Sequence, residues 1–287
     1  IFRINIPMEI ITTIKQCVEY LETCPRPLGL VPTMGALHNG HKELIKVASK
    51  NDSTVAVSIF VNPLQFGPNE DLDNYPSQID SDVGKLKDLS VNLVFLPSPE
   101  EIYPDNFSTS INVGGMSNVL EGKSRPGHFN GVATIVCKLL AIINPNHAYF
   151  GEKDAQQCLV IEKMVSDLNI KTAILKVPTV RDPDGLAISS RNLHLSKSER
   201  DSATVIYKSL SLAYKLHSEG IKNTDFIKKS MSELIYSVPF TKQDYISIAK
   251  PSNLEELDSI DCEALVSVAV FIGKTRLIDN IYLKSAY

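Results

Sequence analysis

The sequence predicts an α/β protein, with a mostly parallel sheet covered by helices on both faces and a smaller α+β domain after it. Three observations predict this class. Short apolar runs alternate with helix-like stretches over the first two thirds of the chain, which is the pattern of βαβ units. The run Thr54–Val61 is β-branched and almost continuous, as in a strand that is buried on both faces. The alternation stops near Thr179, where a turn-rich segment begins.

The first part of the chain, residues 1–179, contains the elements of the parallel sheet. A helix is expected on the apolar stripe that begins at Leu44, and two more over 131–143 and 156–168. Strands are predicted at 28–31, 54–61, 93–96, 148–150 and 172–177. Open, Rossmann-like sheets of this kind bind ligands beyond the carboxyl ends of their strands. The unusual motifs of the sequence follow expected strands.

The second part, residues 180–287, is expected to form the smaller α+β domain. Arg181–Gly185 is a turn-rich joint between the two parts. A long helix is predicted over 197–219, followed by a polar segment that contains Asn223. Phe271–Asn280 is interpreted as a strand, a turn and another strand that pack this domain. The strands predicted from the apolar runs lie at 245–249, 265–272 and 281–283.

The composition argues against a nucleic-acid or membrane partner. The 287 residues carry a formal net charge of −4 and are 43% hydrophobic and 22% charged, which is ordinary for a globular protein without a basic surface. No apolar run approaches the roughly 20 residues that span a bilayer, and the opening segment Ile1–Ile6 is too short for a signal peptide. The five cysteines include no CxxC pair, which argues against a disulfide framework or structural zinc. We therefore expect a cytoplasmic protein with reduced thiols.

The segment PTMGALHNGH, which ends at His41, lies between an expected buried strand and an expected amphipathic helix. Gly35 and Gly40 permit a tight backbone close to a ligand, and a helix start offers N–H groups and a positive dipole end to phosphate. His38 and His41 can donate to phosphate oxygens that gain charge. Two alternatives stay open from the residues alone. One is a surface turn with solvated histidines, and the other is a zinc pair, for which no third ligand lies nearby.

A second motif, SIFVNPLQFG, ends the strand predicted at 54–61. The amides of Asn62 and Gln65 can hydrogen-bond a hydroxyl or a carboxylate without adding charge, and their apolar neighbours could wall a pocket. The alternative is that Asn62 and Pro63 only end the strand. Carboxylates follow, most of them expected on an exposed face, and one or two of them could hold Mg²⁺ through water. They are Glu70, Asp71, Asp73, Asp80 and Asp82.

Two basic segments come next along the chain. The Gly-rich loop 121–131 holds Arg125 and His128, which could lie over an anion. We interpret it as a positioning loop, with a simple connector as the alternative. Lys153 follows a strand and a glycine, as in a phosphate-binding turn that feeds a helix. The alternative is a charged helix start in which Asp154 is only a cap.

The last motif lies between the two expected domains. Ser189, Ser190 and Arg191 place two hydroxyls and a guanidinium in sequence. These groups could bind a triphosphate through charge-assisted hydrogen bonds. The alternative is a helix-capping turn with a surface arginine.

Together and in this order, the motifs resemble the pantothenate synthetase (pantoate–β-alanine ligase) family of the nucleotidyltransferase superfamily, in which an HxGH segment grips ATP phosphates. The resemblance covers the chain from about residue 28 to 280. The matching segments are PTMGALHNGH, VSIFVNPLQFG with EDLDNYP, RPGHFNGVATIVCKLL, FGEKDAQQ, PTVRDPDGLAISSRN and FIGKTRLIDN.

The resemblance implies a two-step, ATP-dependent reaction. Pantoate and MgATP would give pantoyl adenylate and pyrophosphate, and the amine of β-alanine would then attack the acyl carbon to give pantothenate and AMP. ATP as co-substrate, Mg²⁺ and a homodimer are the family expectations. The smaller domain, hinged near 180–185, is expected to act as a lid that keeps water from the adenylate.

The resemblance also implies site residues. His41 would be the general acid or charge stabiliser, with His38 beside it and Lys153 on a phosphate. Gln65 and Gln157 would hold pantoate, with Gln65 also near β-alanine. A weaker pantoate candidate is Asn62. The residues implied to contact ATP are Met34, Gly35, Ala36, Leu37, His38, Asn39, Gly40, His41, Gly151, Glu152, Lys153, Asp154, Val180, Ile188, Ser189, Ser190 and Arg191.

Three positions depart from the family pattern. Ile188 replaces the usual Met but keeps an apolar wall, Ser77 replaces a common Arg and removes a charge, and Asn146 replaces a frequent Asp. The main rival is another adenylyl- or cytidylyltransferase of the same fold, which would share the HxGH segment but leave the two glutamines and the SSRN segment unexplained. A nucleotide-binding regulatory module and an RNA-binding synthetase fragment are remoter alternatives, and the acidic net charge argues against the latter.

Overall fold

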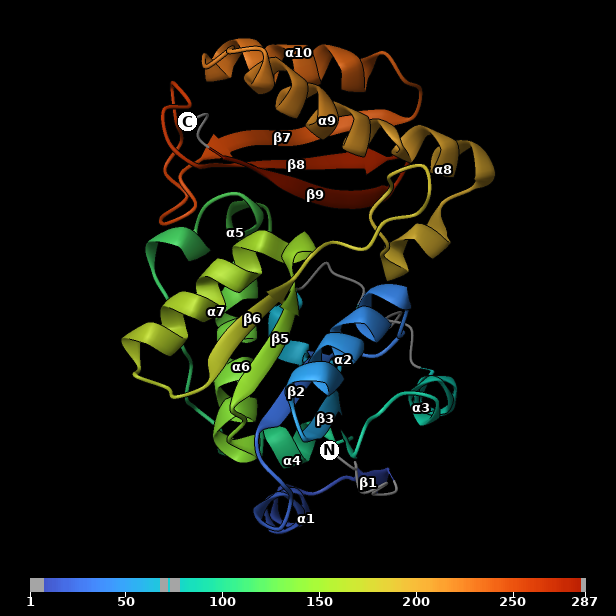
Figure 1. The fold of residues 1–287 in the computed structure, drawn as a ribbon, viewed down its shortest axis with the longest axis vertical. Helices are drawn as coiled ribbons and strands as arrows, with labels where there is room; N and C mark the ends of the chain where they lie inside the picture. Colours follow the sequence, from blue (N-terminus) through green and yellow to red (C-terminus); the bar gives the residue numbers. More distant parts are fainter. Residues whose placement is uncertain (1–7, 68–71, 73–77, 285–287) are drawn as a thin grey trace. The chain divides into compact units, whose positions relative to one another are not determined.

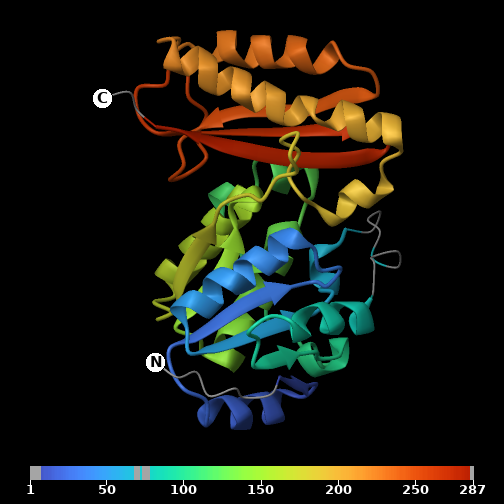
Figure 2. The same ribbon diagram turned by 45° about the vertical axis from the view of Figure 1, so that its right-hand side comes forward.

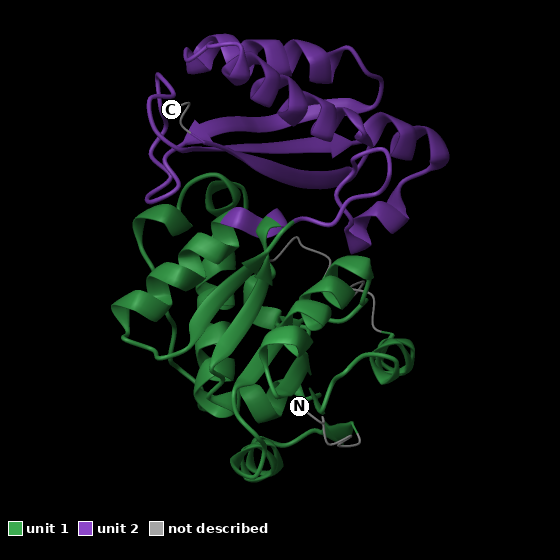
Figure 3. Cartoon of the chain, viewed as in Figure 1, with its two compact units in different colours: residues 1–152, 156–178 green, residues 153–155, 179–287 purple. Residues whose placement is uncertain are grey.

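The computed structural model describes residues 8–67, 72 and 78–284. The chain divides into two compact units, which Figure 3 colours separately. The first unit comprises residues 1–152 and 156–178, and the second comprises residues 153–155 and 179–287. The short segment Lys153–Ala155 therefore groups with the second unit, although its neighbours in sequence belong to the first.

The first unit contains a six-stranded sheet in which every pairing is parallel. This confirms the fold class predicted for the first part of the chain. The strand order is β1-β4-β3-β2-β5-β6, so the direction of progression reverses between β2 and β5. The strands are β1 Glu9–Ile11, β2 Leu28–Thr33, β3 Thr54–Ile59, β4 Leu93–Phe95, β5 His147–Gly151 and β6 Ala173–Val177.

Helices lie on both faces of this sheet (Figure 1), and an apolar cluster packs against each face. One joins Leu28 and Leu30 to buried side chains of α1, α6 and α7, and the other joins Val31 to α2 and α3. Because consecutive strand residues project to opposite faces, a strand between two helical layers is buried on both faces and is therefore mostly apolar. The helices are α1 Ile14–Glu22, α2 Asn39–Asn51, α3 Ile79–Lys87, α4 Pro99–Ile102, α5 Glu121–Ser124, α6 His128–Ile143 and α7 Ala155–Asp167.

The second unit contains a three-stranded antiparallel sheet in the order β7-β8-β9. Helices α9 and α10 lie along one face of this sheet (Figures 1 and 2), and side chains from them and from the strands form one apolar core. The elements are α8 Lys197–Ala203, α9 Val205–Ser218, α10 Thr224–Tyr236, β7 Thr241–Ala249, β8 Ala264–Ile272 and β9 Thr275–Leu283. Throughout the described part of the chain, each helix is too short or too polar to span a bilayer.

Several elements differ from the sequence-based expectation. The helix predicted over 197–219 is interrupted at Thr204, whose hydroxyl donates to the carbonyl of Asp201 (2.8 Å) and so competes with helical bonding. The polar segment around Asn223 starts a helix, because the Asn223 side chain accepts the N–H of Phe226 (2.8 Å) and caps α10. The elements β1, α1, α3, α4 and α5 were also not predicted.

A buried carboxylate ties α2 to β5 at the amino edge of the parallel sheet. Asp52, the C-cap of α2, accepts hydrogen bonds from Nδ1 of His147 (2.7 Å) and from the hydroxyl of Tyr149 (2.5 Å). Burial, with Asp52 as hydrogen-bond partner, raises the pKa of the Tyr149 hydroxyl. Gly29 of β2 lies against the same carboxylate, and a Cβ there would come within 2.4 Å of Oδ2. Two strands and a helix therefore meet at one side chain.

Candidate active site

The turn between β2 and α2 lies at the carboxyl edge of the parallel sheet, beside the point where the strand order reverses. Gly35 (φ +88) and Ala36 (φ +50) both adopt the left-handed conformation, which lets the chain turn sharply into the helix. Helix α3 holds the next residue, Leu37, on both sides. The Leu37 N–H donates to Asp82 (2.9 Å), and its carbonyl accepts from Lys85 (2.9 Å). Asp82 and Lys85 are themselves paired at 3.0 Å, so the peptide that precedes the helix is fixed.

His38 and His41 form a capping box at the start of α2. His38 is the N-cap, and its Nδ1 accepts the N–H of Gly40 (3.1 Å). The Nδ1 of His41 accepts the N–H of His38 (3.2 Å). The two rings are stacked, with centroids 4.0 Å apart and planes inclined by 30°. Two imidazoles thus take the places that a hydroxyl and a carboxylate hold in the usual capping box.

These capping bonds determine the tautomer of each imidazole. A ring nitrogen that accepts a backbone N–H must carry a lone pair, so in the neutral ring the proton lies on Nε2. Both histidines therefore have an Nε2–H donor, at the helix end whose dipole favours phosphate. Both residues are partly exposed. The structure thus brings together the two histidines that the sequence singled out.

The second motif follows β3 and centres on Asn62, which is 1% exposed and caps the 3₁₀ turn Pro63–Gln65. Its Nδ2 donates to Oε1 of Gln65 (3.1 Å) and to the carbonyl of Gly131 (3.1 Å). Its Oδ1 accepts from the hydroxyl of Tyr103 (2.8 Å) and from a backbone N–H (3.3 Å). Burial raises the pKa of Tyr103, which keeps this hydroxyl a donor. All four bonding positions of the Asn62 amide are engaged, so its effect is to orient Gln65.

Gln65 lies beside Met34, which comes from the preceding βα turn. Its Nε2 contacts the Met34 sulfur (2.6 Å), and a thioether is a weak acceptor that a substrate oxygen would replace with gain. The carbonyl of Gln65 accepts from Nδ1 of His128 (2.8 Å) and from Arg125 (3.4 Å). Arg125 also donates to Nε2 of His128 (3.0 Å). The loop 121–131 therefore positions Gln65, in the way that the sequence analysis interpreted it.

The third segment begins at Gly151, the last residue of β5, and continues through the 3₁₀ turn Glu152–Asp154 into α7. The side chain of Lys153 is 16% exposed and lies 3.8 Å from the carboxylate of Asp154. One turn into α7, Gln157 is partly exposed. Its neighbour Gln156 is buried and donates to two loop carbonyls. Of these two glutamines, only Gln157 has surface available for a ligand.

In the second unit, residues 180–188 form a short hairpin. The carbonyl of Val180 accepts the N–H of Ile188 (2.9 Å), and Arg181 forms a β-bridge with Ala187. Gly185 turns the chain with a φ of +93. The hairpin places the two predicted nucleotide contacts Val180 and Ile188 opposite each other.

A 3₁₀ turn, Ser190–His194, continues directly from the hairpin. Ser189 is its N-cap, and its Oγ accepts the N–H of Arg191 (3.3 Å). Arg191 is exposed, and both serines are partly exposed. The capping turn and an anion site are therefore compatible, because the cap engages only one of the two hydroxyls.

Sequence reasoning missed Lys85 and Tyr103 as supports of the candidate site, and it considered Asp82 only as a carboxylate that could hold Mg²⁺. Asp82, Lys85 and Tyr103 contact residues 45, 48 and 41 positions away, and no local pattern reports such a pairing. The spacing of Asp82 and Lys85 on one helix face was the one signal available.

The predicted carboxylates do not form a metal centre in the described part of the chain. Glu70, Asp71 and Asp73, together with Ser77, lie outside the described residues. Asp80 is exposed, and Asp82 is buried against Leu37 and Lys85. Within residues 8–67, 72 and 78–284, no group of three or more His, Cys, Asp or Glu side chains could hold a metal ion.

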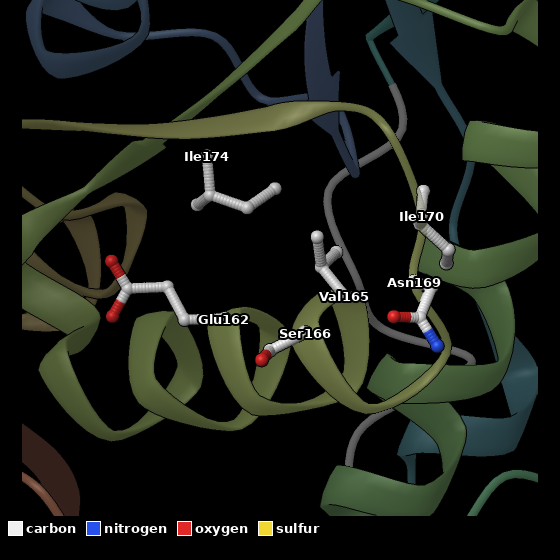
Figure 4. Close-up of a pocket in the computed structure, with 6 residues that line it drawn as sticks. All are labelled: Glu162, Val165, Ser166, Asn169, Ile170 and Ile174. Carbon is white, nitrogen blue, oxygen red and sulfur yellow. The ribbon is translucent and has the colours of Figure 1, made fainter.

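A pocket between α7 and β6 contains none of the predicted site residues (Figure 4). It lies near the amino end of β6, whereas ligands of parallel sheets bind at the carboxyl ends. It is therefore not part of the candidate site. The pocket is lined by Glu162, Val165, Ser166, Asn169, Ile170 and Ile174.

Comparison with known proteins decides the family. Residues 9–282 match the sequence profile of pantoate-beta-alanine ligase. The chain belongs to the pantoate–β-alanine ligase family. A similar pantothenate synthetase from Caldicellulosiruptor bescii is 46% identical over 275 residues, which cover 96% of this chain and 98% of the relative. Another, from Thermosipho africanus, is 50% identical over 266 residues, which cover 92% and 95%.

Solved structures of pantoate–β-alanine ligases share the fold. The pantothenate synthetase of Thermus thermophilus has a TM-score of 0.91 at 40% identity, covering 96% of this chain and 99% of its own. The pantoate–β-alanine ligase of Francisella tularensis, solved with beta-gamma ATP and β-alanine, has a TM-score of 0.79 at 40% identity, covering 96% and 97%. Both the predicted fold class and the predicted family are confirmed, and the chain is a ligase.

Proposed function

We propose that this ligase condenses pantoate with β-alanine while ATP is converted to AMP and pyrophosphate. In the first step, a carboxylate oxygen of pantoate attacks the α-phosphorus of ATP, and pyrophosphate leaves. In the second step, the amine of β-alanine attacks the acyl carbon of pantoyl adenylate, AMP leaves, and pantothenate is formed. Family membership supports this reaction, and the groups described above suit its charge changes.

The observation that carries the proposal is the pair of imidazoles that caps α2. Adenylation adds negative charge to the α-phosphate and to the departing pyrophosphate, and donors that are already oriented stabilise such charge most effectively. The capping bonds of His38 and His41 hold both rings before substrate arrives, so little orientation remains to be gained during the reaction. We assign His41 as the general acid or charge stabiliser, and His38 as a phosphate-binding neighbour. The backbone of Met34–His41 would line the nucleotide.

Cationic and nucleotide contacts would come from Gly151–Asp154, of which Lys153 and Asp154 belong to the second unit, and from residues 180–191 of that unit. We assign Lys153 to a phosphate, since a compact ammonium suits a phosphoryl oxygen, and Gly151–Asp154 to the nucleotide. Ser189–Arg191 would bind the triphosphate through charge-assisted bonds. The backbone-paired residues Val180 and Ile188 would form an apolar contact with the nucleotide.

Amide groups of the first unit would hold pantoate. Gln65 and Gln157 can pair with its hydroxyl and carboxylate groups without adding charge, and Gln65 would also lie near β-alanine. The saturated amide of Asn62 favours an indirect role, in which Asn62 orients Gln65.

Mg²⁺ is proposed to enter as part of the MgATP substrate. Mg²⁺ in nucleotide sites usually keeps water and phosphate oxygens as ligands and takes only one or two carboxylates. The lack of a three-ligand cluster among the described residues is compatible with this mode. Asp82 is buried against Leu37 and Lys85, so we treat it as an anchor of the β2–α2 turn.

A homodimer, a lid role for residues 180–287 and a cytoplasmic location complete the proposal. The dimer rests on family resemblance. The lid rests on chemistry, because an acyl adenylate must be kept from water. The location is supported by the five cysteines, none of which forms a disulfide, as expected in a reducing compartment.

The test is a reaction of the purified chain with ATP, pantoate and β-alanine, in which AMP, pyrophosphate and pantothenate are quantified by chromatography. We expect equal amounts of the three products, and no sustained AMP release when either pantoate or β-alanine is omitted. AMP release that does not depend on β-alanine would refute the proposal in favour of another nucleotidyltransferase. ATP binding without turnover would favour a regulatory module.

A further inference from the structure

Two adjacent buried residues of β9 contact Lys153 and the hairpin that leads into Ser189–Arg191. The Nδ2 of Asn280 donates to the carbonyl of Lys153 (2.9 Å). The carboxylate of Asp279 accepts two hydrogen bonds from Arg181 (2.5 and 3.0 Å). Asp279 and Asn280 are only 3% and 7% exposed. The segment 271–280, which the sequence analysis treated as structural, therefore reaches groups that the proposed function needs.

Arg181 extends this contact into the 180–188 hairpin. Its guanidinium also donates to the carbonyl of Gly185 (3.1 Å) and stacks over the ring of Tyr207 at 4.2 Å. Both partners of the Arg181–Asp279 pair are largely buried, with side chains 18% and 2% exposed. A bidentate guanidinium–carboxylate pair fixes direction as well as distance. The hairpin that leads into Ser189–Arg191 is therefore held in one orientation against β9.

The two contacts are also joined to each other. The backbone N–H of Asn280 donates to Oδ1 of Asp279 (2.8 Å), so one hydrogen-bonded path leads from Lys153 through both residues to Arg181. All of these residues belong to the second unit. Buried ion pairs add little net stability compared with apolar packing, but they define geometry. The path is therefore better explained by a need for geometry than by a need for stability.

We propose that Asp279 and Asn280 are positioning residues for the ATP-using step. They hold Lys153 and the segment Ser189–Arg191 at a fixed spacing, so that the ammonium, the hydroxyls and the guanidinium meet the triphosphate in one arrangement. Neither residue is assigned a contact with the substrate. The inference rests on the proposed function, because it takes the triphosphate as the ligand of these groups.

The test separates the two half-reactions in the full chain. Asn280→Leu removes the donor to Lys153 at similar volume, and Asp279→Asn weakens the pair with Arg181 without changing shape. We expect each variant to slow pantoate-dependent exchange of pyrophosphate into ATP by about 10- to 100-fold, as a misplacement of about 1 Å can do. Conversion of pre-formed pantoyl adenylate and β-alanine to pantothenate should stay within about twofold of wild type, because that step needs no triphosphate.

Thr224→Val is the matched control. Thr224 is 1% exposed and donates to the carbonyl of Leu257 (2.5 Å) in the same unit, but it contacts neither phosphate-handling segment in the described structure. Its loss should lower the melting temperature in the way that Asn280→Leu does, while both half-reactions stay near wild type.

The outcomes are distinguishable. Equal losses in the two half-reactions, or equal losses in Asn280→Leu and Thr224→Val at the same melting temperature, would overturn the positioning role. If Asn280→Leu does not fold, Asp279→Asn decides by the same ratio of half-reactions. If the wild-type chain shows no pantoate-dependent exchange, the proposed function itself fails, independently of any variant.

Discussion

The two turns that carry the phosphate-binding candidates are built in opposite ways. The imidazoles of the His38–His41 turn are oriented locally, because each histidine caps the helix through backbone groups two or three residues away. The Ser189–Arg191 turn depends on distant residues, since the hairpin before it is held by Arg181 against Asp279, 98 positions along the chain. The capping bonds of the first turn need only its own residues, although Asp82 and Lys85 of α3 fix the peptide at Leu37 before it. The second requires the whole small sheet to be folded.

The two turns therefore differ in what orients their phosphate-binding side chains. Imidazoles that are already engaged in a helix cap have little rotamer freedom left, so they should act as rigid donors. An exposed guanidinium such as that of Arg191 must be ordered when ligand binds, which reduces its net contribution. We therefore expect substitutions in the first turn to affect the rate most, and substitutions in the second to affect ATP affinity.

His41→Ala should have the largest effect and is the main test of the rigid turn. We expect pantoate-dependent pyrophosphate release to fall about 10³-fold, with about 1 kcal/mol of stability lost with the cap. Rapid-quench measurement of the adenylation rate and a thermal melt check the two parts. Near-normal adenylation would remove His41 from the site.

His38→Asn separates capping from phosphate binding. Asn is a preferred N-cap residue, so the helix start should survive while the Nε2–H donor is lost. We expect an unchanged melting temperature and an adenylation rate lower by about 10²-fold. A variant with the wild-type rate would show that His38 only caps α2.

Lys153→Met tests the cationic phosphate contact that we assign to the second unit. The 3.8 Å pair with Asp154 contributes little to stability, so the melting temperature should hardly change. The adenylation rate should fall by about 10²-fold. The control is Lys163→Met, since Lys163 of the helix that follows, α7, pairs with Asp167 and is half exposed. Equal rates in the two variants would contradict the assignment of Lys153.

Gln65→Ala should chiefly reduce the use of pantoate. Loss of one substrate hydrogen bond corresponds to about a 10- to 100-fold lower kcat/KM for pantoate, with the KM for ATP nearly unchanged. Asn62→Ala should give a similar kinetic change together with a lower melting temperature, because Tyr103 and the Gly131 carbonyl lose a buried partner. Steady-state kinetics with each substrate varied separately decide this. A change confined to the KM for ATP would show that Gln65 is misplaced in our scheme.

Arg191→Ala is expected to have the smallest effect, and it tests the turn that contrasts with His38–His41. It should raise the KM for ATP by about tenfold without changing the melting temperature, because the side chain is exposed. The effect should diminish at high salt, where exposed charges are screened. An effect on rate as large as that of His41→Ala would show that the two turns act alike.

The parallel sheet could be predicted from sequence because its strands are buried on both faces. The residues of β3, Thr54–Ile59, are apolar or β-branched except for Ser58, and all of them are buried, which leaves little alternative. Amphipathic surface helices such as α1 and α10 were harder to predict from sequence, since the start of each helix depends on a single polar residue. Thr13 and Asn223 both cap helices through side-chain oxygens, and in sequence each looks like an ordinary polar residue.

The candidate site was also predictable only in part, namely where its residues adjoin buried strands. His38, His41, Asn62 and Gln65 stand next to strand ends, so their common location could be inferred from the topology of parallel sheets. The residues that orient these side chains could not be inferred in this way. The contact between Leu37 and Asp82 joins a turn to a helix 45 positions away, and the Asn280–Lys153 bond spans 127 positions. Such pairings are set by tertiary packing, which leaves no periodic trace.

The carboxylate of Asp52 has a consequence for which sequences this fold can accept. Oδ2 occupies the space that any side chain at position 29 would need, and both oxygens are engaged by His147 and Tyr149. A substitution at one of these four positions therefore creates a clash or an orphaned polar group unless another changes with it. The four positions should vary together among relatives, at the edge of the sheet opposite the candidate active site.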